Sequence, residues 1–505
     1  MGAARVSEHG KMEQGLRQNA LEWGSSWNGA LSRVASVHIT PLAAAGVAAF
    51  VSFVLGAYAA LQSPGLQLEP DLVANALYFD QLLKGEKSLG ELWYFTAPKP
   101  LTIVFLGGVV GGLGAVLVSS AIAALAVFSI SFVVARGFGG LVGLVAGLML
   151  TQDPRWSILL SVGGADLFTA TFVAAAIAAW VGGRERIAAT AVFLAVLGKP
   201  TAAVVVAPLL LDVERELRPR LRLVAAAAAG LLATAACYYA LLGGVDVPSR
   251  FLVAYSSLVP PPPAPLGWLV GYFRDDLASK LLWMSWPLAL IGLGAVAATR
   301  EARALRQLIG AALLLAVAHV ALAWWTDTQL FARFLWMLEA SAVVLSVVGA
   351  FWAPRALATR GHSSRLCGGL TLLALGVLFM NLQSAGSLRN SEYARYFSDR
   401  ALKAAPLIDH LSRVRAPAEA VVSPLWLQAS VLRRLGLSST PGDVRAAEVL
   451  GARNQDDSRD VRWLLFAPGL YEKTGERWVR AELEAHSYSR VAESGSPPFL
   501  LLRRD

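Results

Sequence analysis

Two carboxylates lie close together in the segment that follows the first long apolar run of this chain. Glu69 and Asp71 are two residues apart in GLQLEPDLVANALYFDQLLKG, residues 65–85. A carboxylate at the edge of a membrane can act as a general base, because poor solvation raises its pKa toward neutral pH. Asp71 would equally well cap a helix that begins there, and Glu69 would equally well be a solvated loop residue. The residues alone leave these interpretations open.

Two basic residues occur at positions where they could bind an anion close to these acids. Lys99 occurs in YFTAPKPL, and Arg333 opens the apolar run ARFLWMLEAS. Lysine and arginine both bind phosphate, arginine often through two parallel hydrogen bonds. Each would instead anchor a helix end at a membrane surface, because long cationic side chains reach from apolar surroundings to water.

Three further charged residues stand at or near the ends of apolar runs. They are Asp153 in LTQDPRW, Asp166 in GGADLF and Lys199 in LGKPTA. An acid deep in a membrane helix costs about 2.5–3.5 kcal/mol, so Asp166 is either a helix cap or a functional residue. Asp71 and Asp166 together could hold Mg²⁺ or Mn²⁺ through oxygen ligands. We expect His319, inside an apolar run, to be a packed, hydrogen-bonded residue.

The composition predicts which kind of secondary structure positions these residues. Of the 505 residues, 56% are hydrophobic and 16% are charged, against about 25% charged in soluble proteins. Many apolar runs approach the roughly 20 residues that cross a membrane as a helix, so we expect an all-α polytopic membrane protein rather than a β-barrel. The sequence predicts about eleven spans, near residues 42–62, 112–135, 138–151, 161–182, 187–199, 201–211, 222–242, 278–298, 307–325, 333–352 and 366–383.

The distribution of arginine predicts the orientation of these spans. The net charge of +9 does not indicate nucleic acid, because the excess arginine lies in short loops, where the positive-inside rule places it in the cytoplasm. An odd span count places the C-terminal region outside, and a miscount of one would place it in the cytoplasm. The arginine-bearing loops hold Arg136, Arg184, Arg186, Arg215, Arg218, Arg220, Arg222, Arg300, Arg303, Arg306, Arg355, Arg360 and Arg365.

The chain divides into three parts by composition. Residues 1–40 are polar and are expected to be a cytoplasmic segment, followed by the transmembrane domain at 41–383. Its first outer loop, 63–111, contains an amphipathic stretch that predicts an interfacial helix. Residues 384–505 predict a small soluble extracytoplasmic α/β domain, with a strand and a helix in EAVVSPLWLQASVLRRLG and strands in DVRWLLFAPG and PFLLLRRD. We expect the broken run at Lys199–Pro200 to form a tight helix pair.

The order of these motifs resembles a known family. EPDLVANALYFDQLLKG resembles the first-loop motif of the GT-C glycosyltransferases, in the branch of the protein O-mannosyltransferases and the lipid A aminoarabinose transferase. APKPLTIVFLGGVVGGLG resembles its Lys-Pro segment, GGADLFTATFVAAAIAAW its Asp-initiated span, and LGKPTAAVVVAPLLL its Lys-Gly/Pro span. ARFLWMLEASAVVL takes the place of its Arg-Tyr-x-x-Pro segment and lacks the Tyr and the Pro. The resemblance covers roughly residues 40–350.

The resemblance implies transfer of a hexose or pentose from a polyprenyl-phosphate donor, on the extracytoplasmic face, with inversion. It implies Asp71 as the general base, with Glu69 as second choice, and Lys99 and Arg333 as ligands of the donor phosphate. Asp153, Asp166 and Lys199 form a possible additional site. No cofactor is expected to be required, with Mg²⁺ or Mn²⁺ as the alternative. The partners implied are membrane lipids and a protein, lipid or glycan acceptor.

Two other functions remain open from the sequence. One is a flippase or transporter of a lipid-linked sugar, although no internal repeat of the kind common in transporters is visible. The other is a polymerase or ligase of surface polysaccharide, which shares the lipid-linked donor. We expect the chain in a plasma membrane, the inner membrane of a bacterium, with its N-terminus in the cytoplasm.

Overall fold

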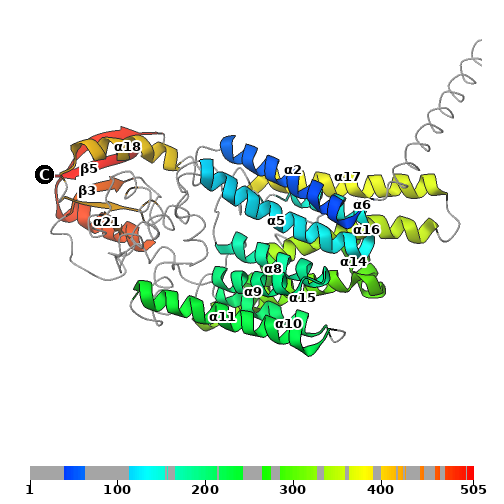
Figure 1. Cartoon of the computed structure of the whole chain (residues 1–505). Helices are drawn as coiled ribbons and strands as arrows, with labels where there is room; N and C mark the ends of the chain where they lie inside the picture. Colours follow the sequence, from blue (N-terminus) through cyan, green and yellow to red (C-terminus); the bar gives the residue numbers. More distant parts are fainter. Residues whose placement is uncertain are drawn as a thin grey trace, which may run out of the picture.

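The computed structural model shows a bundle of helices and a small α/β domain (Figure 1). The residues that the structure describes are 39–62, 113–153, 156, 165–212, 215–242, 264–274, 285–326, 335–358, 363–389, 400–416, 419–424, 427, 431, 444–447, 461–466, 473–495 and 498–505. Glu69, Asp71, Lys99 and Arg333, with the expected interfacial helix, lie outside these ranges.

Every apolar run expected to span the membrane contains a helix. Six helices are long and apolar enough to cross a membrane: α2 (Pro41–Gln62), α5 (Leu113–Phe138), α11 (Leu217–Leu242), α15 (Arg303–Thr326), α16 (Trp336–Ala358) and α17 (Ser364–Arg389). The shorter helices are α6 (Gly140–Leu150), α8 (Ala165–Val181), α9 (Glu185–Gly198), η4 (Pro200–Val205), α10 (Val206–Leu210), α13 (Pro265–Gly271) and α14 (Trp286–Ala298). The chain is a multi-pass membrane protein, and the count of eleven spans stays a prediction.

Two helices, α8 and α16, pass through the middle of the bundle. Nearly all side chains of α8, and all from Trp336 to Ala350 in α16, are buried. Helices that are apolar on every side are buried on every side. Each of the two nevertheless carries one acid in its first turn, Asp166 in α8 and Glu339 in α16. These acids are therefore held inside the bundle.

The run broken at Lys199–Pro200 forms the expected pair of antiparallel segments. Helix α9 ends at Gly198, Lys199 is extended, and η4 begins at Pro200, whose ring stops the preceding helix. The chain then returns through α10 to Asp212, which contacts Trp180 at the end of α8. Lys199 thus lies at the turn of the pair, far along the bundle from Asp212.

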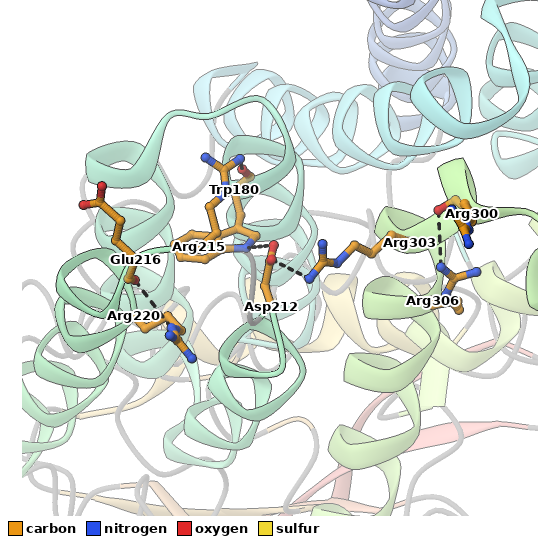
Figure 2. A network of polar contacts seen from close by, with 8 residues as sticks. All are labelled: Trp180, Asp212, Arg215, Glu216, Arg220, Arg300, Arg303 and Arg306. Atoms are coloured by element: carbon orange, nitrogen blue, oxygen red, sulfur yellow. Dashed lines mark hydrogen bonds and ion pairs between the residues drawn. The ribbon is translucent and has the colours of Figure 1, made fainter.

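The loops rich in arginine meet at one end of the bundle, which we call the arginine-rich end (Figure 2). The Trp180 indole donates to Asp212 Oδ2 over 3.0 Å, and Arg303 Nη2 lies 2.5 Å from Asp212 Oδ1. Arg215 donates to the Trp180 carbonyl oxygen over 3.1 Å and lies over the indole ring. Arg306 donates to the Val296 carbonyl oxygen near the end of α14. Asp212 therefore ties the end of α8 to the loops that open α11 and α15.

The opposite end, which we call the domain end, faces the α/β domain (Figure 1). Helices α2 and α17 end there, and α5, α8, α14 and α16 begin there. Exposed aromatic side chains mark this end, as they do at membrane–water interfaces. They are Tyr58, Tyr239, Trp286, Trp324 and Trp325.

The α/β domain contains a five-stranded mixed sheet in the order β2-β1-β3-β5-β4. The predicted strands are present as β1 (Ala420–Ser423), β3 (Val461–Phe466) and β5 (Phe499–Arg504). Strand β2 (Val444–Ala446), the edge strand β4 (Tyr488–Ser494) and the helices α18 (Arg400–Val414) and α21 (Lys473–Ala485) were not predicted. The helix predicted after β1 lies mostly outside the described residues. Strands β1, β2 and β3 are parallel, and β5 is antiparallel to β3 and β4. Helix α17 runs six residues beyond the expected boundary at 383, to Arg389.

Glu419 ties the start of β1 to its neighbours in the sheet. Its Oε2 accepts from the Trp463 indole over 2.7 Å and from the Ala416 amide over 3.1 Å. Arg503 lies 3.6 Å from Oε1 and over the Trp463 ring. Burial alone would raise the pKa of Glu419, but the two hydrogen bonds and the charges of Arg503 and Arg462 outweigh it and hold the pKa below its usual value.

Helices α14 and α16 approach backbone to backbone at two glycines. A Cβ added at Gly292 would overlap the Leu345 carbonyl oxygen, and one added at Gly349 would overlap that of Leu288. Small residues permit such close packing between membrane helices. This contact fixes the position of α16, which carries Glu339.

The Gly292–Gly349 contact leads to a stability prediction. Gly292→Ala should lower the free energy of unfolding by about 1–3 kcal/mol, because the methyl group forces the helices apart. Gly294→Ala is the matched control in the same helix, since its Cβ would meet no atom within 4 Å, and it should be neutral or slightly stabilising. Thermal unfolding in detergent measures both, and equal midpoints would contradict this account of the packing.

The lowered pKa of Glu419 leads to a pH prediction. The stabilisation is complete above the unfolded-state pKa and is lost as pH falls through the folded-state pKa. Glu419→Gln should therefore lower the stability of the domain by about 1 kcal/mol at pH 7, because bonds to a charged acceptor become bonds to a neutral one. The difference from wild type should shrink below about pH 4.5, near the ordinary glutamate value.

Glu493 provides the control for this measurement. It forms an exposed pair with Arg490 at 2.6 Å, and such pairs contribute about 0–1 kcal/mol. Glu493→Gln should change the unfolding midpoint little at either pH. A difference between Glu419→Gln and wild type that persists unchanged at pH 3 would contradict the assignment.

Candidate functional site

Of the candidate residues named from the sequence, the structure describes Asp153, Asp166 and Lys199. All three lie at the domain end, where α6 ends, α8 begins and α9 turns into η4. The helices that flank residues 63–112 also end and begin there, as does α16, which follows Arg333 in sequence. The assignments of Asp71, Glu69, Lys99 and Arg333 therefore stay predictions.

Asp166 and Lys199 form an ion pair inside the bundle. Asp166 stands in the first turn of α8, and Lys199 is the C-terminal cap of α9; both side chains are largely buried. Gly198 lets the turn approach α8, since a Cβ there would lie 2.8 Å from Thr169 Oγ1. A buried charge is tolerated only when it is paired, so each residue stabilises the other. The sequence analysis named both residues but did not predict the pair.

His319 borders this pair from α15. Its Nδ1 lies 2.7 Å from the Leu315 carbonyl oxygen, and its Nε2 lies 3.5 Å from Thr201 Oγ1. A carbonyl oxygen only accepts, so Nδ1 carries the proton and Nε2 of the neutral ring can accept from the Thr201 hydroxyl. His319 is thus a packed, hydrogen-bonded residue, as expected, and it also places a polar ring beside Lys199.

A second buried acid, Glu339, was missed by the sequence analysis. It is completely buried, and its Oε1 accepts a hydrogen bond of 2.5 Å from the Tyr272 hydroxyl. Tyr272 follows α13, stacks on Trp268 and packs against Ala316, one turn from His319. The signal for Glu339 was the same as for Asp166, an acid near the start of an apolar run. Nothing in the sequence identified Tyr272.

Asp153 lies near the start of α16, next to Trp156, which stacks on Trp336. It is 1% exposed, and its carbonyl oxygen accepts from the Trp156 amide over 2.9 Å. The Trp156 ring stacks on that of Trp336, with centroids 4.9 Å apart. Trp336 is the first residue of α16, one turn before Glu339.

These contacts join five buried polar or charged residues across the domain end of the bundle, which we call the polar layer: Asp153, Asp166, Lys199, His319 and Glu339. The layer offers carboxylates, a cation and an imidazole within a low-dielectric interior, where electrostatic interactions are strong. Within the described ranges, no group of three or more His, Cys, Asp or Glu side chains is placed to hold a metal ion. Asp71, the other expected metal ligand, lies outside those ranges.

The comparisons with known proteins bear on the fold. No family model and no curated protein sequence matches the chain. The crystal structure of ArnT from Cupriavidus metallidurans bound to undecaprenyl phosphate matches with a TM-score of 0.57 and 14% identity, over 90% of this chain and 97% of ArnT. Its apo form matches with a TM-score of 0.54 and 14% identity, over 89% and 97%. ArnT is a GT-C glycosyltransferase. The chain has the GT-C fold.

The GT-C fold was expected from the motif order and is confirmed. A third structure, the Archaeoglobus fulgidus oligosaccharyltransferase in complex with zinc and sulfate, matches with a TM-score of 0.46 and 11% identity, over 84% of this chain and 67% of that chain. At these identities the likeness concerns the fold, and the activity is argued separately.

The ion pair in the polar layer predicts strong coupling between its members. Asp166→Asn and Lys199→Met should each lower the free energy of unfolding by about 3–5 kcal/mol, because each leaves an uncompensated buried charge. The double variant Asp166→Asn/Lys199→Met should recover most of that loss, because neither buried position then carries a charge. Thermal unfolding in detergent completes this double-mutant cycle.

The exposed pair Arg222–Glu185, with atoms 3.1 Å apart, is the control for this cycle. Arg222→Gln should cost less than about 1 kcal/mol. Losses from Asp166→Asn and Lys199→Met that simply add in the double variant would show that the pair is not a stabilising unit.

Proposed function

We propose that this protein is a membrane glycosyltransferase that moves a sugar from a polyprenyl phosphate to a hydroxyl group on the extracytoplasmic side. The observation that carries the proposal is the GT-C fold over 90% of the chain, together with charged residues buried at one end of the bundle. The ordered motifs of the sequence point to the same class. The ArnT structure holds undecaprenyl phosphate, which supports a lipid of that class as the donor here.

The domain end is the side on which we place the reaction. Loops rich in arginine favour the cytoplasm, and they gather at the opposite end. The α/β domain would then be extracytoplasmic, and the N-terminus cytoplasmic. Acceptor recognition by the α/β domain would follow from its position facing the domain end of the bundle (Figure 1).

In the proposed mechanism Asp71 is the general base, and Glu69 is the second choice. Asp71 takes the proton of the acceptor hydroxyl as its oxygen attacks the anomeric carbon. The bond from that carbon to the phosphate oxygen breaks, the sugar inverts, and polyprenyl phosphate leaves. Lys99 and Arg333 stabilise the charge of the departing phosphate. The polar layer provides the fixed, water-poor surroundings in which such charges act strongly.

A flippase is the second candidate function, because a lipid-linked sugar would also need a polar route through the bundle. It predicts polar residues along the whole depth of the membrane. Within the described helices of the bundle, the buried acids lie at the two ends, and the buried polar residues between them are mostly serines and threonines, such as Ser129, Ser131 and Ser346. A polysaccharide polymerase or ligase would share the donor and differ in its acceptor.

The test of the proposed function is transfer by the purified protein in lipid, with a panel of polyprenyl-phosphate sugars. Wild type should release polyprenyl phosphate from one donor. Asp71→Asn should reduce this release by about a hundredfold or more, the usual contribution of a general base. Lys99→Ala should reduce it with an accompanying loss of donor affinity. Product release is measured by chromatography of the extracted lipid.

Asp80 provides the matched control, since it lies in the same amphipathic stretch on the other side of the helical wheel. Asp80→Asn should transfer at the wild-type rate. Full activity of Asp71→Asn would overturn its assignment as base, leaving Glu69. No release from any donor, by protein shown to be folded and to bind the lipid, would favour the flippase.

A further inference from the structure

Three tryptophans are among the largest fully buried side chains in the described part of the chain: Trp180, Trp336 and Trp463. Trp180 donates its indole N–H to Asp212 over 3.0 Å, and Trp463 donates to Glu419 over 2.7 Å. Trp336, 1% exposed, has no acceptor for its N–H among the residues described, and neither does its stacking partner Trp156, 2% exposed. The indole N–H groups of Trp156 and Trp336, both without an acceptor among those residues, thus belong to two rings that stack on each other.

Such a pair is costly in the ligand-free protein. A buried donor without an acceptor loses the free energy of its hydrogen bond to water and gains nothing in return. Native proteins pair the great majority of buried polar groups, so each exception calls for an explanation. A phenylalanine pair would keep the aromatic stacking and carry no buried donor. The indoles are therefore better explained by an acceptor that arrives from outside the chain.

The position of the pair restricts what that acceptor is. Trp156 belongs to the turn that begins at Asp153, and Trp336 begins α16, one turn before Glu339. Both belong to the same buried cluster at the domain end, where α6 packs against α16. An oxygen that reaches the two N–H groups lies within the bundle at the level of the polar layer. This is the level at which the proposed function requires the polar head of the donor, while its lipid tail remains outside.

We propose that Trp156 and Trp336 form a binding subsite in which both indole N–H groups donate to acceptor oxygens of the donor's head group. The inference rests on the proposed function and deepens it. The oxygens belong either to the phosphate or to the sugar hydroxyls, which share the same acceptor chemistry. Indole N–H groups donate only, so the subsite selects oxygen acceptors and rejects ammonium groups.

The experiment compares binding and stability in the same variants. Trp336→Phe and Trp156→Phe keep an aromatic ring and remove the N–H. Each should weaken binding by about tenfold or more, the effect of one hydrogen bond to a charged or strongly polar oxygen. Binding of undecaprenyl phosphate and of undecaprenyl-phosphate glucose is measured in detergent by the rise in unfolding temperature with lipid concentration.

Trp180→Phe is the matched control, because it removes the same atoms from an equally buried indole whose N–H is already paired. It should lower the unfolding temperature of the lipid-free protein more than Trp336→Phe does, and it should leave lipid affinity at the wild-type value. If Trp336→Phe does not fold, 3-benzothienyl-alanine placed at position 336 keeps both fused rings without the N–H.

The outcomes separate this inference from the proposed function. Weaker binding of both lipids by Trp336→Phe assigns the acceptor to the phosphate, and weaker binding of the glucosylated lipid alone assigns it to the sugar; either supports the subsite. Wild-type affinity of both tryptophan variants for both lipids overturns the subsite and leaves the proposed function standing. Failure of wild type to bind either lipid, with the unfolding transition intact, overturns the proposed function and the subsite together.

Discussion

The pairing of charge inside a low-dielectric bundle is the constraint on which the rest of the structure depends. Asp166 and Lys199 are 33 positions apart in sequence, at the start of α8 and at the end of α9, and neither charge is stable there without the other. Their contact fixes the start of α8 against the turn after α9. That turn sets where η4 begins, and η4 brings Thr201 to His319 on α15. One ion pair therefore determines the register of three segments.

The two ends of the bundle stabilise their charged residues in different ways. At the arginine-rich end, Asp212 is held by Arg303 and the Trp180 indole, and the surrounding loops are basic and partly exposed. Cations there can reach water and lipid phosphates, so pairing is partial. At the domain end the polar layer is buried among α6, α8, α15 and α16. The charges of the polar layer are thus enclosed, whereas those of the arginine-rich end are partly exposed to water.

The sequence predicted the parts of this protein that depend on local pattern. Apolar runs indicated most of the described helices of the bundle, though not α13, because hydrophobicity over about 20 residues decides insertion. Pro200 indicated the turn after Lys199, and β-branched and aromatic runs indicated three strands. The edge strand β4 was missed because its side chains are mostly exposed and polar. Its place in the sheet comes from pairing with β5, which no local pattern encodes.

The contacts between the site residues could not be predicted from the sequence, because they too depend on how separate segments pack. Asp166 and Lys199 were both visible, but their pairing depends on how α8 and α9 pack. Tyr272 meets Glu339 across 67 residues of chain, and the stack of Trp156 on Trp336 joins residues still farther apart in the sequence. Glu339 could have been predicted, because it is an acid near the start of an apolar run. The predicted base and phosphate ligands rest on resemblance of motifs alone.

The shortness of α9 has a consequence for the depth of the Lys199 charge. With 14 residues, it extends about 21 Å at 1.5 Å per residue, against a hydrocarbon thickness of about 30 Å. The turn at Lys199 therefore stops well short of the far surface of an undeformed bilayer. Because α9 packs against α8, α11 and η4, the neighbouring segments rather than lipid enclose this turn. The short helix therefore places the Lys199 charge within the depth of the bundle, where a longer helix would carry it out to the membrane surface.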